Sequence, residues 1–168
     1  MIYRLHYNKM EDDFIELRPD AFQEIQLACM SSEFQKISTE PIEVETSEEL
    51  GGMIFPDFMY DDAVPLFSEP LYQAIKQIPV CNLFSKEVIV NDKLQGISKK
   101  YILGLPPRIA VKDAFGEISS ERIGNYQIFK TEDFSNNHIY ITEKLKDFLV
   151  QLKPIGMEIV EADVLCVI

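Results

Sequence analysis

The chain has 168 residues, 46% of them apolar, and a formal net charge of −12 at pH 7. This length is enough for one domain with its own core. We predict a single domain over 1–168, with a division into an N-terminal region (residues 1–52) and a main region (residues 53–168) as the alternative. Nucleic-acid binding is disfavoured because phosphates would be repelled, and no apolar run approaches the roughly 18 residues of a membrane-spanning helix.

The first fourteen residues, MIYRLHYNKMEDDF, lack the basic-then-apolar layout of a signal peptide. The three cysteines, Cys29, Cys81 and Cys166, form no C-x-x-C motif and lie among apolar residues. We therefore expect a cytoplasmic protein with buried, reduced thiols and no disulfide framework.

The first half of the chain contains short β-branched, aromatic or alternating segments that are typical of strands. In chain order we expect a strand over 2–7, a strand over 14–17, a helix from Asp20 to about Met30, a strand over 41–45 and an ordered irregular loop over 53–65. Gly51 and Gly52 are expected to break the chain before that loop. Pro56 and Pro65 interrupt the loop itself.

The second half contains a hairpin pattern, in which KEVIV and KKYILGL flank the turn-rich NDKLQG. Pro106 and Pro107 are expected at a strand end or sheet edge, because proline cannot donate to a ladder. Further elements follow, namely a turn around Gly116, strands in 125–130 and 138–142, and one or two strands in 157–168. Strands do not alternate with long helices, so we predict an α+β fold with a mainly antiparallel or mixed sheet and two or three short amphipathic helices.

Two of these helices share a pattern, FSEPLYQAIKQI at 67–78 and ITEKLKDFLVQL at 141–152. In each copy four apolar residues lie at i, i+3, i+4 and i+7, on one helical face. Ser68 and Thr142 are favourable N-caps, and the following Glu69 and Glu143 suit the positive end of the helix dipole. Capped amphipathic helices are common, so the repeat itself is equally compatible with coincidence.

The excess negative charge is concentrated in one window. No Lys or Arg lies between Lys36 and Lys76, and that window holds nine of the twelve excess negative charges. Such a surface would attract and steer a basic protein partner. The alternative is a solvated acidic loop that contributes only solubility.

A search for catalytic motifs is mostly negative, because neither histidine lies at ligand spacing from another His or Cys and no phosphate-binding loop or nucleophile elbow occurs. Asp57, Asp61 and Asp62 form the best metal-like cluster, and clustered carboxylates can hold Mg²⁺ or Ca²⁺. The loop lacks the glycine and the closing glutamate of a calcium hand. We therefore favour a partner surface over a metal site, and expect no cofactor. Asp113, Ser119 and Ser120 suit a turn.

Several segments, in the order in which they occur, resemble the bacterial polymorphic-toxin immunity proteins of family eleven, formerly a domain of unknown function. The resemblance covers about residues 53–162. Its motifs are Phe55-Pro56-Asp57-Phe58, the Ser68-Glu69 helix, the strand from Tyr101 to Pro107, Ile128-Phe129-Lys130, Thr142-Glu143-Lys144-Leu145, and Gly156 to Glu161. Lys130 replaces a more typical Arg, and Asp113 and Ser119 only approximate the expected Asp and Ser spacing.

The resemblance implies an immunity protein, which is not an enzyme and which neutralises a cognate toxin domain by stoichiometric occlusion. The expected partner is a basic toxin domain, such as a nuclease, and the acidic window would supply the contact. Aromatic residues would serve as buried anchors. The predicted partner-binding residues are Glu43, Glu45, Glu48, Glu49, Phe55, Asp57, Phe58, Tyr60, Asp61 and Asp62. The alternatives are a small metal-dependent enzyme that uses the Asp57–Asp62 cluster, or an adaptor subunit of a larger assembly.

Overall fold

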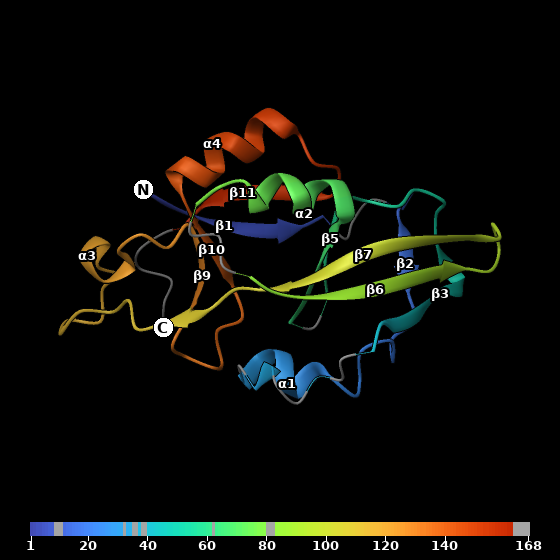
Figure 1. The fold of residues 1–168 in the computed structure, drawn as a ribbon, viewed down its shortest axis with the longest axis horizontal. Coiled ribbons are helices and arrows are strands. Elements are labelled where there is room, and N and C mark those ends of the chain that lie inside the picture. Colours follow the sequence, from blue (N-terminus) through green and yellow to red (C-terminus); the bar gives the residue numbers. More distant parts are fainter. Residues whose placement is uncertain are drawn as a thin grey trace.

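The structure is a computed structural model that describes residues 1–8, 12–31, 33–34, 37, 40–61, 63–79 and 83–162, with only the backbone of Asp61. The described residues form an α+β fold with a sheet-dominated core, as predicted (Figure 1). The helices are α1 (Gln26–Ser31), α2 (Glu69–Lys76), α3 (Ser120–Ile123) and α4 (Glu143–Leu152). None of them is both long and apolar enough to cross a membrane.

The first sheet has the order β11-β1-β10-β9-β8. Its strands are β1 (Ile2–Tyr7), β8 (Arg108–Ile109), β9 (Ile128–Thr131), β10 (Ile139–Thr142) and β11 (Met157–Glu161). The amino-terminal strand β1 lies between β10 and β11 and pairs antiparallel with both. Only the short β8 runs parallel to its neighbour, β9.

The second sheet has the order β2-β3-β6-β7-β5-β4. Its strands are β2 (Ile15–Leu17), β3 (Ile42–Gly51), β4 (Phe58–Asp61), β5 (Val64–Ser68), β6 (Phe84–Asp92) and β7 (Ile97–Leu105). β6 and β7 form the predicted hairpin, with Asp92 opposite Ile97. β3 pairs parallel with β6, and β1 belongs to the first sheet, so residues 1–52 contribute strands to both sheets.

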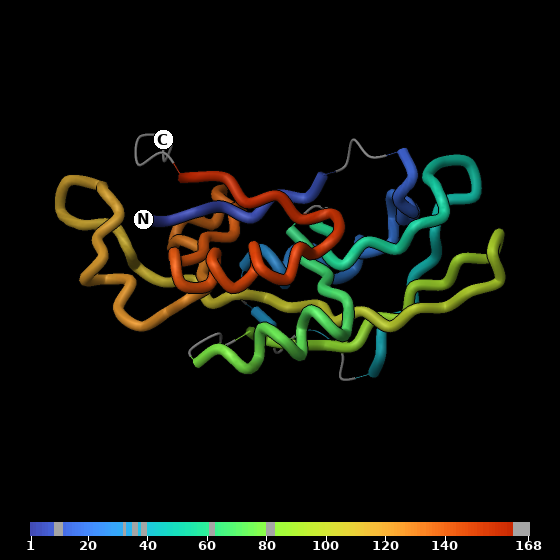
Figure 2. The backbone as a smooth tube through the Cα atoms, turned by 90° about the horizontal axis from the view of Figure 1, so that it is seen from above, coloured from blue at the N-terminus to red at the C-terminus, as the bar shows by residue number. Residues whose placement is uncertain are grey.

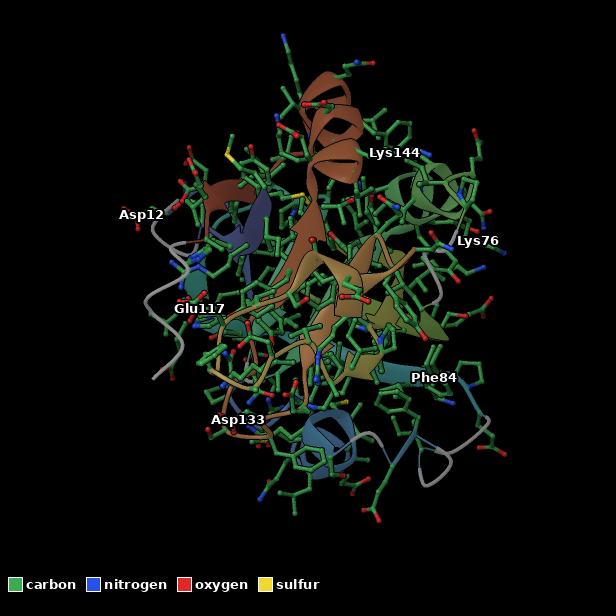
Figure 3. All side chains as sticks on the ribbon, turned by 90° about the vertical axis from the view of Figure 1, so that its left-hand side faces the viewer. Asp12, Lys76, Phe84, Glu117, Asp133 and Lys144 are labelled. Atoms are coloured by element: carbon green, nitrogen blue, oxygen red, sulfur yellow. The ribbon has the colours of Figure 1, made fainter. Side chains whose placement is uncertain are left out.

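The two copies of the repeated pattern form α2 and α4, which lie on the same side of the sheets, with α1 on the opposite side (Figures 1 and 3). Leu71 and Ile75 of α2 and Leu145 and Leu149 of α4 are buried in one cluster, which contains residues of both sheets. Each helix buries its single apolar face in this cluster. The cluster therefore connects the two sheets.

The capping of the two helices differs. The Ser68 hydroxyl accepts from the Leu71 N–H at 3.4 Å, as predicted. Thr142 occupies the N-cap position of α4 but its side chain makes no capping bond, and its hydroxyl donates to the Gln127 side chain. The similar sequences therefore differ in how their first turns are satisfied.

Three predictions of secondary structure are wrong. Residues 53–65 are not all irregular, because they contain β4 and the start of β5. Pro65 is tolerated there since the pairing of β5 with β7 begins only at Leu66, so its missing N–H removes no bond to β7. The helix after Asp20 begins only at Gln26, after a series of turns. β3 continues to Gly51, beyond the predicted 41–45.

The turn around Gly116 is confirmed, with the Gly116 N–H donating to the Asp113 carbonyl at 3.1 Å. Asp113 also accepts from the Phe115 N–H at 2.8 Å, as an Asx turn does. Cys29 is buried, as expected, and burial raises the pKa of its thiol to about 11. Cys81 and Cys166 lie outside the described residues.

Candidate partner-binding surface

Four of the predicted acids lie on β3 and differ in whether a base neutralises them. Glu45 is paired with Lys93 at 2.9 Å and with Arg18 at 3.4 Å. The hydrogen bond from Lys93 lowers the pKa of Glu45. The other three side chains are exposed, and among the described residues none of them forms an ion pair; they are Glu43, Glu48 and Glu49. The uncompensated charge therefore gathers toward the carboxyl end of β3.

Gly51 and Gly52 bring a second acidic segment against this strand end. A Cβ on Gly52 would lie 2.3 Å from the Asp13 carbonyl, and one on Gly51 would lie 2.6 Å from the Glu16 nitrogen. The close approach is fixed by hydrogen bonds, including Gly52 N–H to the Phe14 carbonyl at 2.6 Å. The exposed Asp12, Asp13 and Glu16 consequently lie beside the end of β3.

Exposed apolar side chains lie at the same end of the molecule. Met53 and Leu94 are 69% and 73% exposed, and the Gln95 side chain donates to the Met53 carbonyl at 3.0 Å, which joins the hairpin tip to the segment after β3. Figures 1 and 2 both show the β6–β7 tip at the same end as β2 and the end of β3. We name this region the hairpin-end surface and define it as Asp12, Asp13, Glu16, Glu48, Glu49, Leu50, Met53, Ile54, Leu94 and Ile97.

The prediction that Phe58 is a surface anchor is wrong. Phe58 is fully buried, and its ring packs against that of Phe67 with centroids 5.2 Å apart. Tyr60 also belongs largely to the interior: its hydroxyl donates to the Asn137 carbonyl, and burial raises its pKa above the ordinary value. Phe55 is half-buried, with the Lys99 ammonium 5.2 Å from its ring centroid.

Asp57 has an internal structural role. Its carboxylate accepts from the Ser68 hydroxyl at 2.9 Å and from the Ile155 N–H at 2.8 Å, so it links α2 to the loop before β11. Both of its oxygens are thereby engaged, which removes Asp57 from the set of acids that are free to meet a partner.

The predicted carboxylate cluster does not converge around Asp57. Asp57 directly precedes β4 and Asp61 is its last residue, so four steps along an extended chain place their backbones about 13 Å apart. Asp62 and the side chain of Asp61 lie outside what the structure describes. Among the described residues, no group of three or more His, Cys, Asp and Glu side chains could hold a metal ion.

A buried basic centre around Lys130 of β9 was not predicted from the sequence. Lys130 is 1% exposed, its ammonium lies 5.5 Å from the Tyr60 ring centroid, and it has no hydrogen-bond partner within the described stretches of the chain. The adjacent Arg108 donates to four backbone carbonyls and to the Asn137 side chain. Burial, followed by the Arg108 charge, lowers the pKa of Lys130 to about 8.

The only two histidines of the sequence are neighbours in the structure. The rings of His6 and His138 are stacked, with centroids 6.3 Å apart. Burial and the charge of Arg4 lower the pKa of both imidazoles. The pair favours its neutral form, and sequence spacing could not reveal it because the two positions are 132 apart in the sequence.

Comparison with models of known protein families found no match to this chain, and a comparison with curated proteins found none either. The functional assignment therefore depends on the surfaces described above.

Proposed function

We propose that this chain is an immunity-type inhibitor, which binds a basic toxin domain through the hairpin-end surface and blocks it by occlusion. The supporting observation is that exposed apolar side chains and uncompensated acids share this one end of the molecule. An apolar centre with a polar rim is the usual composition of a protein–protein interface. In this proposal the protein acts in the cytoplasm and is not an enzyme.

The two kinds of side chain have separate roles in the proposed complex. Leu50, Met53 and Leu94 would be removed from water on binding, which contributes affinity in proportion to the apolar area buried. Glu16, Glu48 and Glu49 would raise the association rate with a basic partner, and this contribution should weaken with salt.

The test is affinity capture from the native host, followed by mass spectrometry, with two matched charge variants. Glu16→Lys/Glu48→Lys/Glu49→Lys reverses three acids of the hairpin-end surface. The control reverses three exposed acids elsewhere, Glu24, Glu117 and Glu121. The turn around Gly116, which contains Glu117, lies at the opposite end of the molecule from the β6–β7 tip (Figures 1 and 2). We expect a basic domain to be recovered at near one-to-one stoichiometry by the wild type and the control, and to be lost with the first variant.

Co-expression then separates inhibition from simple binding. If the captured domain is toxic when produced alone, and this chain restores growth only when its hairpin-end surface is intact, the immunity function is supported. Capture of a harmless subunit would favour the adaptor alternative and overturn the proposal. Equal capture by both charge variants would remove the hairpin-end surface from the interface.

A further inference from the structure

A cleft of about 440 Å³ opens within the hairpin-end surface, between β2 and the end of β3. Its walls combine polar and apolar side chains, and the apolar ones include Ile15, Leu17 and Met59. The rings of Tyr7 and Phe14 also line it; they are nearly parallel, at 12°, with centroids 6.4 Å apart. This volume is within the range of sites that enclose a small ligand or a single large side chain.

The charged side chains in the described lining of the cleft have one sign. Three carboxylates line it, those of Asp12, Glu16 and Glu49, and the described lining contains no Lys, Arg or His. Aromatic faces and carboxylates around an apolar floor attract a cation that has an apolar stem. The carboxylates attract the charge, the rings offer their negative faces, and the floor accepts methylene groups.

The two glycines shape the backbone beside the cleft. Gly51 lines it and has a φ of +94°, a conformation that L-residues rarely adopt. The backbone of 51–54 lies against 13–15 through three hydrogen bonds of 2.6–2.9 Å, so the opening is fixed by main-chain pairing rather than by mobile side chains. Preformed shape reduces the entropy lost on binding.

We propose that this cleft receives an arginine side chain presented by the partner protein, an inference that rests on the proposed function. Arginine fits these walls better than lysine, because its planar guanidinium stacks on aromatic rings and forms paired hydrogen bonds with carboxylates. Its methylene groups lie along Ile15, Leu17 and Met59, and its charge meets Glu16 and Glu49. The cleft thus selects a single anchoring residue within the larger interface.

The test uses the isolated protein and a small probe, so that it does not require the partner. N-acetyl-arginine amide is titrated into isotopically labelled protein, with N-acetyl-citrulline amide as the neutral isostere. We expect saturable shifts of amide signals at 12–17 and 49–52 with the arginine probe, and none with the citrulline probe. Shifts spread evenly over all exposed acids, or equal responses to both probes, would overturn the inference.

Variants then assign the binding to the cleft. Glu16→Gln/Glu49→Gln should weaken probe binding by about tenfold, as the product of two partly exposed ion pairs each worth roughly threefold. Glu43→Gln, an exposed acid on β3 outside the cleft lining, should leave binding unchanged. An equal loss in both variants, or no loss in the double variant, would contradict the assignment.

The two proposals can fail separately. Probe binding in the cleft without capture of a toxin would retain an arginine-binding site and remove the immunity function. If the protein captures a toxin but does not bind the arginine probe, the interface proposal is retained and the proposal of an arginine anchor is overturned.

Discussion

Replacement of Lys130 by Met should stabilise the protein at neutral pH. Lys130 is buried and lacks a hydrogen-bond partner within the described residues, and its pKa falls from 10.5 to about 8 on folding. A shift of this size corresponds to about 3 kcal/mol of destabilisation whenever the amine is charged in both states. Methionine has a similar length and no charge, so the substitution should remove this destabilisation. It also removes the contact with the Tyr60 ring, which reduces the gain by about 1 kcal/mol. We therefore expect the free energy of unfolding to rise by about 2 kcal/mol.

The pH dependence gives a second, independent readout. Because folding lowers the pKa of Lys130, the unfolded chain binds more protons than the folded one between the two pKa values. Lys130 should therefore contribute a rise in stability of about 2 kcal/mol between about pH 7 and about pH 9.5, which is below the ordinary pKa of tyrosine. Folding raises the pKa of Cys29, so this thiol should offset about 1 kcal/mol of that rise as the pH approaches 9.5. Lys130→Met should lack the rise and retain only the fall caused by Cys29.

Urea unfolding at both pH values measures these effects. The control is Lys144→Met on the exposed surface of α4 (Figure 3), which should change stability by less than about 0.5 kcal/mol. Destabilisation by Lys130→Met at about pH 7, or a wild type whose stability does not rise with pH, would refute the reasoning that Lys130 is buried as an uncompensated cation.

Four further substitutions probe three other features. Gly52→Ala should lower the free energy of unfolding by about 3 kcal/mol in urea titrations, because its Cβ would overlap the backbone of the neighbouring segment. Gly96→Ala meets no neighbour and should lose only about 1 kcal/mol, from its positive φ. Since folding lowers the pKa of His6 and His138, stability should fall as the pH drops below about 6.5, and His6→Gln should make that fall shallower in thermal unfolding curves. Asp57→Ala should lower the unfolding free energy by about 2 kcal/mol, because it removes two hydrogen bonds to a carboxylate.

Each of these has an outcome that would contradict it. Equal losses for the two glycine variants would show that overlap with the neighbouring backbone contributes nothing at Gly52. A stability that rises as the solution is acidified from neutral pH would reverse the sign expected for the histidine pair. Wild-type stability of Asp57→Ala would mean that its link between α2 and the loop before β11 is dispensable.

Local pattern was sufficient for much of the fold. The hairpin of β6 and β7 and the buried positions Leu71, Ile75, Leu145 and Leu149 of α2 and α4 were predicted from strand and helix periods of two and 3.6 residues. Leu152, the last apolar residue of the second repeat, was expected on the same face but is 44% exposed. β4 and β5 were missed because Pro65 suggested an interruption, whereas its place in a ladder depends on which neighbour needs its N–H.

The candidate site was less accessible from sequence because it is assembled from distant segments. The acids of β3 were identified by their charge, but Asp12, Asp13 and Glu16 join them only through the close backbone approach at Gly51 and Gly52. The exposed Leu94 belongs to a hairpin tip whose position beside Met53 is a tertiary contact. Conversely, Phe58 was predicted at the surface since no local pattern distinguishes a core aromatic residue from an interface one.

The position of β1 imposes an order on folding during synthesis. β1 leaves the ribosome before the other described strands, yet its hydrogen-bonding neighbours, β10 and β11, come from residues 139–161. The second sheet draws its strands from residues 15–105 and can pair earlier. The strand IYRLHY can therefore form its native pairs only after residues 139–161 have emerged. Until then its edges lack their native partners, which exposes it to mispairing in a nascent or truncated chain.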